Sequence, residues 1–151
     1  MNVRLALTEQ QALALTMWGE ARGDNADGSS VEERIAVGCV IRNRVLSGRW
    51  AADYKGTCLQ PLQFSCWNED GSANAEALLA RATALVNGDQ PDPLMRECLF
   101  LAEGIIHMDL LDRTHGATHY VTRALLESHP PSWLRGVSPV ATVGSQVFFR
   151  L

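Results

Sequence analysis

The sequence is poor in lysine and has no long apolar run. Lys55 is the single lysine among 151 residues, the arginines are scattered, and the formal net charge is −4. An acidic chain without a basic cluster is not expected to bind nucleic acid. No stretch reaches the roughly 20 apolar residues of a membrane-spanning helix. The apolar run Leu5-Ala6-Leu7 is also too short for a signal-peptide core, so we expect a protein made without an export signal.

Closely spaced cysteine pairs are missing as well. The four cysteines are Cys39, Cys58, Cys66 and Cys98, and no two of them form a C-x-x-C pair. A structural zinc site is therefore not expected. Cys39 and Cys98 fall inside helical patterns and are predicted to be small core residues. Cys58 and Cys66 share one loop region, and the sequence leaves open whether they form a disulfide.

Four segments have the apolar spacing and the end signals of helices. The first two begin with capping boxes, Thr8-x-x-Gln11 and Ser30-x-x-Glu33. The fourth has proline at its first position, where the missing N–H costs nothing. The predicted helices run from Thr8 to Gly23, from Ser30 to Gly48, from about Ala75 to Asn87, and from Pro93 to about Met108.

Two segments near the C-terminal end are typical of strands. Residues 117–122 and 146–150 are short and rich in β-branched and aromatic side chains, and they are predicted to pair. Helices followed by a small sheet indicate an α+β fold. The length fits one compact domain over residues 1–151. Between the second and third helices, residues 49–74 show no clear period. A loop of that length that contains Trp50, Phe64 and Trp67 is predicted to be functional.

Glu20 is the first candidate for a chemical role. Leu13, Met17 and Glu20 fall on one face of the first predicted helix, so an acid lies at the end of an apolar stripe. Desolvation and the helix dipole are both expected to raise the pKa of its carboxyl group. A general acid for a glycosidic oxygen needs a raised pKa. A structural pair with Arg22, or a capping role, would explain the same position.

Six motifs in register resemble one family. They are Met17-Trp18-Gly19-Glu20-Ala21-Arg22-Gly23-Asp24, Ile35-Ala36-Val37-Gly38-Cys39-Val40-Ile41-Arg42-Asn43-Arg44-Val45, Gln63-Phe64-Ser65-Cys66-Trp67, Gly116-Ala117-Thr118-His119-Tyr120, Pro131-Ser132-Trp133 and Val143-Gly144-Ser145-Gln146-Val147-Phe148-Phe149. Together they resemble the cell-wall hydrolase family of the spore-cortex-lytic germination enzymes and several phage endolysins, over nearly the whole chain.

The resemblance implies a lysozyme-like catalytic domain, mostly helical with a small antiparallel sheet near the C-terminus. It implies cleavage of the β-1,4 bond between N-acetylmuramic acid and N-acetylglucosamine, with Glu20 as the catalytic acid. Many family members act as lytic transglycosylases. Asp24 stands where the family commonly has a glutamate, so a carboxylate with a shorter reach is present there.

The second carboxylate decides the mechanism. Hydrolysis with two acids requires carboxyl groups roughly 5 to 9.5 Å apart, and the candidates are Asp24, Glu32 and Glu33. Capping and the helix dipole explain Glu32 and Glu33, and turn chemistry explains Asp24. We therefore favour a lytic transglycosylase, in which Glu20 acts first as acid and then as base. A muramidase that uses water, with Asp24 as second carboxylate, is the alternative.

Several residues are predicted to support Glu20. If residues 118–122 form a strand, Thr118 and Tyr120 share one face and His119 points away from it. Tyr120 is predicted to orient Glu20 or the sugar, or else to be a half-buried sheet residue. Trp18 and Trp133 are assigned to the core. The predicted substrate-binding residues are Gln63, Phe64, Ser65, Trp67, Thr118 and His119.

Three other functions compete with this hypothesis. A zinc amidase would use His115 and His119, with Asp112 as a third ligand, but a turn separates the two histidines. A cysteine peptidase would pair Cys66 with His119, although nothing nearby stabilises a thiolate. A non-catalytic wall-binding module would keep the aromatic groove without needing Glu20. No metal or cofactor is predicted.

The missing export signal also suggests a setting. We expect a monomeric phage endolysin whose partner is peptidoglycan. Such a protein would stay in the host cytoplasm until a holin opens the membrane and gives it access to the cell wall.

Overall fold

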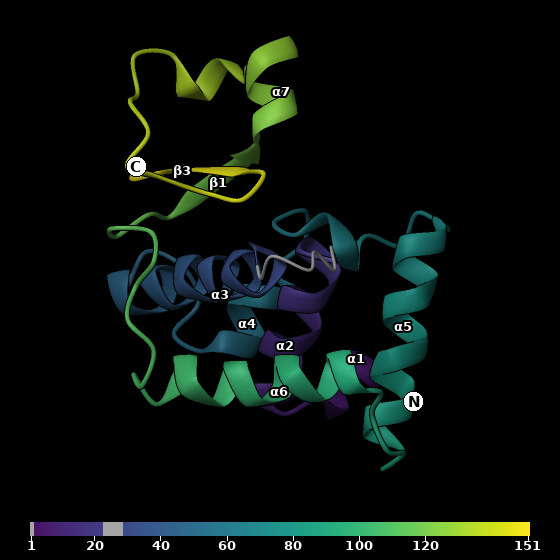
Figure 1. Cartoon of the computed structure of the whole chain (residues 1–151). Coiled ribbons are helices and arrows are strands. Elements are labelled where there is room, and N and C mark those ends of the chain that lie inside the picture. The colour runs from purple at the N-terminus through teal and green to yellow at the C-terminus, as the bar shows by residue number, and fades with distance from the viewer. Residues whose placement is uncertain (1, 23–28) are drawn as a thin grey trace.

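A computed structural model describes residues 2–22 and 29–151 of the chain, and helix α2 is central among its helices (Figure 1). Helices α3, α4, α5 and α6 all pack against α2. The elements in chain order are α1 (Val3–Ala6), α2 (Glu9–Glu20), α3 (Ser29–Ser47), α4 (Tyr54–Leu59), the 3-10 helix η1 (Ser65–Trp67), α5 (Ala73–Val86), α6 (Pro93–Ile106), β1 (His119–Thr122), α7 (Arg123–Ser128), the 3-10 helix η2 (Ser132–Leu134), β2 (Ala141–Val143) and β3 (Gln146–Phe149).

The predicted starts of the first and fourth helices are confirmed. Thr8 caps α2 and forms both hydrogen bonds of the capping box with Gln11. Asp92 caps α6, and Pro93 is its first residue. Helix α2 ends at Glu20, whereas the predicted stop, Gly23, lies outside the described residues.

The predicted start of the second helix is one residue late. Helix α3 begins at Ser29, so Ser30 lies within the helix. Oε1 of Glu33 accepts hydrogen bonds from the backbone N–H and the hydroxyl of Ser145. The side chain of Glu33 is buried, and a buried carboxylate requires such partners. Glu33 thereby links α3 to the turn between β2 and β3.

The sheet has three antiparallel strands in the order β1-β3-β2. The two predicted strands exist and are paired, with His119 opposite Phe149 and Thr122 opposite Gln146. Strand β2 was not predicted, because it is three residues long and lies in a segment rich in proline and glycine. The predicted class, mostly helical with a small antiparallel sheet near the C-terminus, is confirmed.

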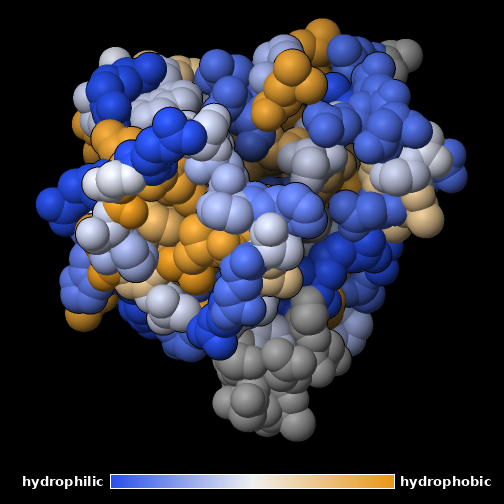
Figure 2. Space-filling view, turned by 90° about the horizontal axis from the view of Figure 1, so that it is seen from above, coloured by the Kyte–Doolittle hydropathy of each residue, from blue (hydrophilic) through white to orange (hydrophobic). Residues whose placement is uncertain are grey.

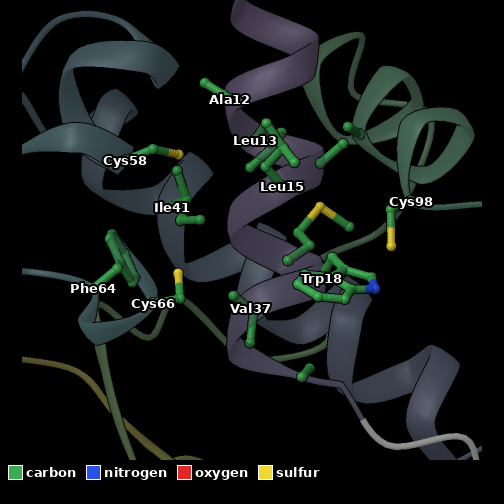
Figure 3. Packing of buried hydrophobic residues seen from close by; sticks show 14 of the residues in the cluster. Ala12, Leu13, Leu15, Trp18, Val37, Ile41, Cys58, Phe64, Cys66 and Cys98 are labelled. Atoms are coloured by element: carbon green, nitrogen blue, oxygen red, sulfur yellow. The ribbon is translucent and has the colours of Figure 1, made fainter. Parts of the chain in front are cut away.

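The long segment 49–74 is not a structureless loop. It contains α4 and η1, which are too short to show a helical period in sequence. Cys58 of α4 and Phe64 and Cys66 near η1 lie on one side of α2, and Cys98 lies on the other (Figure 3). The segment is therefore fixed against the core by buried side chains.

The core is built around α2, where every residue from Ala12 to Gly19 is buried. All four cysteines are buried free thiols, and Trp18 is buried as predicted. Within the described residues, every helix is too short or too polar to span a membrane. In the view from above, onto the side that carries α7 and the sheet, patches of hydrophobic surface lie between hydrophilic residues (Figure 2).

Candidate active site

Glu20 lies where α2 meets the sheet and the loop that carries η1. It is the last residue of the helix and is half-buried. Oε1 accepts a 2.6 Å hydrogen bond from the hydroxyl of Tyr120. Oε2 accepts longer bonds, 3.3 Å from the backbone N–H of Cys66 and 3.5 Å from the hydroxyl of Ser65. Two separate segments, β1 and η1, thus contribute donors to the carboxyl group.

Tyr120 is a hydrogen-bond donor in this arrangement. Burial raises the pKa of Tyr120 well above its usual value of about 10, and the neighbouring carboxyl group of Glu20 raises it further. The hydroxyl therefore keeps its proton at all physiological pH values. Its ring lies 5.6 Å from that of Phe148 on β3, which holds the side chain in place.

A pocket of about 480 Å³ opens beside Glu20. This size is within the usual range for small-ligand sites. The predicted residues Gln63, Phe64, Ser65 and His119 line it together with Glu20 and Tyr120. The ring of Phe64 is almost fully buried in the core, so this residue mainly anchors the loop. The pocket also includes Arg44, Leu62, Trp133 and Leu151, which the sequence analysis did not assign to the site.

Trp133 was wrongly assigned to the core. It is 46% exposed and its ring lies 5.4 Å from His119, at the edge of the pocket. The ring of Trp50 also lies near His119, with the ring centroids 5.8 Å apart. Burial, followed by the charges of Arg44 and Arg49, lowers the pKa of His119 to about 4. His119 is therefore neutral at physiological pH.

Tyr120 and His119 occupy opposite faces of β1 but line the same pocket. Tyr120 packs against the helical core, whereas the ring of His119 lies beside that of Trp133. Both reach the pocket because β1 is an edge strand of the sheet. His119 therefore lines the pocket although its side chain points to the opposite face of the strand from Tyr120, as predicted.

Two predicted binding residues lie elsewhere. Trp67 is buried, and its indole N–H donates a 2.8 Å hydrogen bond to Thr16. It lines a different hollow of about 460 Å³, between α1, η1 and α5. Thr118 is buried behind the pocket, with its hydroxyl 2.9 Å from Nδ1 of His119. Trp67 therefore anchors the loop, and Thr118 supports His119.

Among the described residues that line the pocket, Glu20 is the one carboxyl side chain. Glu32 forms an ion pair with Arg113 at 3.0 Å, and Glu33 is engaged by Ser145. The other predicted candidate, Asp24, lies outside the described residues. The geometry thus supplies one held acid and leaves the second carboxylate as a prediction about Asp24.

The described residues give little support to a zinc amidase or a cysteine peptidase. No three His, Cys, Asp or Glu side chains among them gather as metal ligands. Asp112 instead accepts hydrogen bonds from Thr114, Gly116 and Asn43. The thiol of Cys66 is buried, and this burial, followed by the charge of Glu20, raises its pKa far above the usual range. A nucleophilic cysteine needs the opposite shift.

Comparison with known proteins identifies relatives of the chain. The model of the family described as Cell Wall Hydrolase matches residues 28–149, so Glu20 precedes the matched segment. The catalytic domain of the SleB protein of Bacillus cereus is 21% identical, with a TM-score of 0.58, over 94% of this chain and 89% of that chain. The catalytic domain of the germination-specific lytic transglycosylase SleB of Bacillus anthracis gives the same identity and TM-score over 94% and 93%. No curated protein matches significantly.

Proposed function

Because the chain belongs to the cell wall hydrolase family, we propose that it cleaves the glycan strand of peptidoglycan with Glu20 as its general acid. The bond is the β-1,4 linkage between N-acetylmuramic acid and N-acetylglucosamine. The observation that carries the proposal is the carboxyl group of Glu20, held by Tyr120 and Cys66 beside an open pocket. The similarity in fold to a protein named as a lytic transglycosylase agrees with it.

In the first step Glu20 protonates the glycosidic oxygen. Tyr120 donates to Oε1, so the transferable proton is carried by Oε2. The contacts of Oε2 with Cys66 and Ser65 are long and weak, so this oxygen can donate toward the pocket. The bond between C1 of the muramoyl residue and the glycosidic oxygen breaks, and the N-acetylglucosamine leaves with the proton as its 4-hydroxyl group.

In the second step the 6-hydroxyl group of the same muramoyl residue attacks C1. The bond between O6 and C1 forms, and Glu20, now a carboxylate, accepts the proton of O6. The product is a 1,6-anhydro-muramoyl end, and Glu20 is restored to its acid form. One carboxyl group is sufficient for this sequence, which agrees with the single carboxyl side chain among the described pocket residues.

The test is mass spectrometry of the muropeptides released from purified peptidoglycan. Wild type, Glu20→Gln and Glu127→Gln are compared, the last as an exposed control on α7. We expect 1,6-anhydro-muramoyl ends from wild type and Glu127→Gln, and a loss of at least 100-fold in Glu20→Gln. Full activity in Glu20→Gln, or release of stem peptides alone, would refute the proposal.

Reducing muramic ends would support the muramidase alternative instead. Water would then replace the 6-hydroxyl group, and Asp24→Asn would be the next variant to measure. The setting in a phage-infected host, with release by a holin, stays a prediction. Both structural relatives are bacterial SleB proteins, one of them named for its role in germination.

A further inference from the structure

Arg44 is a buried cation in the wall of the pocket. Only 5% of it is exposed, and no carboxylate among the described residues forms an ion pair with it. Its guanidinium lies near two rings, 5.1 Å from the centroid of Trp50 and 5.2 Å from that of Phe64. Nε donates a 2.7 Å hydrogen bond to the carbonyl oxygen of Thr118. The side chain is therefore fixed on several sides.

The same guanidinium determines how Gln63 is oriented. Nη1 of Arg44 donates a 3.2 Å hydrogen bond to Oε1 of Gln63. A guanidinium has five N–H donors and no acceptor, so only the oxygen of the amide can face it. The amide NH₂ group of Gln63 must then point away from Arg44. Because Gln63 is exposed and lines the pocket, its two N–H donors are available to a ligand.

We propose that Arg44 is a positioning residue that makes Gln63 a fixed donor, and that this donor recognises an amide carbonyl oxygen of the substrate. The inference rests on the proposed function. Two groups of the glycan strand offer such a carbonyl: the 2-acetamido groups of both sugars and the lactyl amide of the muramoyl residue. The positive charge behind Gln63 strengthens its N–H donors through the shared hydrogen bond.

The fixed orientation predicts selectivity. An amide that is free to rotate can present either its oxygen or its NH₂ group, and therefore does not distinguish donors from acceptors. With its oxygen held by Arg44, Gln63 favours a carbonyl oxygen. It disfavours the ammonium group of a de-N-acetylated sugar, which would bring donors against donors.

The decisive variant is Gln63→Glu, which replaces the NH₂ group by an acceptor and keeps the shape of the side chain. The new carboxylate can form an ion pair with Arg44, so the fold is expected to be retained. Binding is measured by calorimetry in a Glu20→Gln background, with soluble glycan strands that keep their stem peptides, because the lactyl amide is the bond to the stem peptide. We expect at least a 10-fold weaker affinity, because a donor to the substrate is lost and a repelling oxygen replaces it.

Gln60→Glu is the matched control, because it adds the same charge on the same loop at an exposed position outside the pocket. Its affinity should equal that of the parent protein. If both variants bind the strands equally weakly, the effect is due to the added negative charge alone and the proposal is overturned. Unchanged binding by Gln63→Glu would overturn it as well. If Gln63→Glu is unstable, Gln63→Ala tests the loss of the donor alone.

A double-mutant cycle of Arg44 and Gln63 distinguishes a positioning role of Arg44 from a purely structural one. Arg44→Lys keeps a donor beside Gln63 and should retain most of the affinity, whereas Arg44→Met should lose as much as Gln63→Ala. If Arg44 acts through Gln63, the double variant Arg44→Met/Gln63→Ala binds no more weakly than Gln63→Ala. Additive losses would mean that Arg44 acts independently of Gln63, which contradicts the proposal.

Three ligands distinguish the source of the carbonyl group. De-N-acetylated glycan strands that keep their stem peptides lack the acetamido carbonyls but retain the lactyl amide, and an N-acetylglucosamine hexamer lacks the lactyl group. If the effect of Gln63→Glu disappears with de-N-acetylated strands and persists with the hexamer, the acetamido group is recognised; the reverse result assigns the lactyl amide. Binding does not require cleavage, so absence of turnover in wild type would refute the proposed function while leaving this inference to be judged by affinity.

Discussion

The hydroxyl of Tyr120 donates a 2.6 Å hydrogen bond to Oε1 of Glu20, although the two residues are 100 positions apart in the chain. Glu20 is the last residue of the central helix α2. Tyr120 lies in β1, an edge strand of the sheet near the C-terminal end of the chain. The bond fixes Oε1 as an acceptor, whereas the contacts of Oε2 with Cys66 and Ser65 are longer. The position of the acid therefore depends on how the sheet packs against α2.

Replacement of Tyr120 by phenylalanine should lower the rate of cleavage with little change in stability. Hydrogen bonds to charged groups contribute about 1.5–3 kcal/mol, which corresponds to a decrease of about 10- to 150-fold in kcat/KM. The ring and its contact with Phe148 are retained, so the melting temperature should stay within a few degrees. Release of soluble muropeptides and thermal unfolding are the measurements.

Tyr54→Phe provides the matched control, because Tyr54 on α4 is the only other tyrosine and does not line the pocket. Its variant should retain wild-type activity. Full activity in Tyr120→Phe would show that the sheet contact is not needed to orient Glu20.

Replacement of Gly19 by alanine should disturb the site through Cys66, whose backbone N–H contacts Glu20. A Cβ atom there would lie 2.6 Å from Cβ and 2.9 Å from Sγ of Cys66, which is closer than packed atoms allow. Gly19→Ala should therefore displace η1 and its contacts with Glu20. Overpacking costs about 1–3 kcal/mol, and the better helix propensity of alanine offsets about 0.5–1 kcal/mol of it. Chemical denaturation measures the loss of stability, and muropeptide release measures the loss of activity.

Cys66→Gly removes both contacting atoms, so the double variant Gly19→Ala/Cys66→Gly should recover part of the activity lost in Gly19→Ala. Gly38→Ala is the control, since its Cβ would meet the flexible side chains of Ile105 and Met17 at 3.1 to 3.3 Å. A stable and fully active Gly19→Ala protein would contradict the close packing of η1 against α2.

His119 should make the folded protein less stable as the pH falls. Burial, followed by the charges of Arg44 and Arg49, lowers its pKa to about 4 in the folded state, whereas an unfolded histidine has a pKa of about 6.5. Between these values the unfolded chain binds more protons, so the stabilising contribution is complete above about pH 6.5 and is lost as the pH falls to about 4. Melting temperatures from pH 7.5 to 4.5 should decrease more steeply for wild type than for His119→Gln.

His129→Gln, at an exposed position after α7, is the control and should follow wild type. The same slope in wild type and His119→Gln would mean that His119 takes up protons equally in the folded and unfolded states.

The sequence alone predicted the features that depend on local chemistry. The capping box of Thr8 and Gln11 and the proline start of α6 follow from the hydrogen-bonding groups of neighbouring residues. The apolar spacing placed Glu20 in the last turn of a buried helix. Enrichment in β-branched and aromatic residues identified β1 and β3, and the family followed from the six motifs. These signals extend over a few residues or repeat with a fixed period, so no knowledge of packing is needed.

Tertiary structure decided which side chains meet. Ser30 and Glu33 have the spacing of a capping box, yet the carboxylate of Glu33 accepts a hydrogen bond from Ser145. Glu33 is buried, and Ser145 lies in the turn between β2 and β3, far away in the sequence. Trp67 and Trp133 exchanged their predicted roles, since an aromatic side chain suits a core and a groove equally well. Arg44 was not predicted to be a site residue. Its partners Thr118 and Gln63 belong to other segments, and only the packed fold brings Arg44 into contact with them at the pocket.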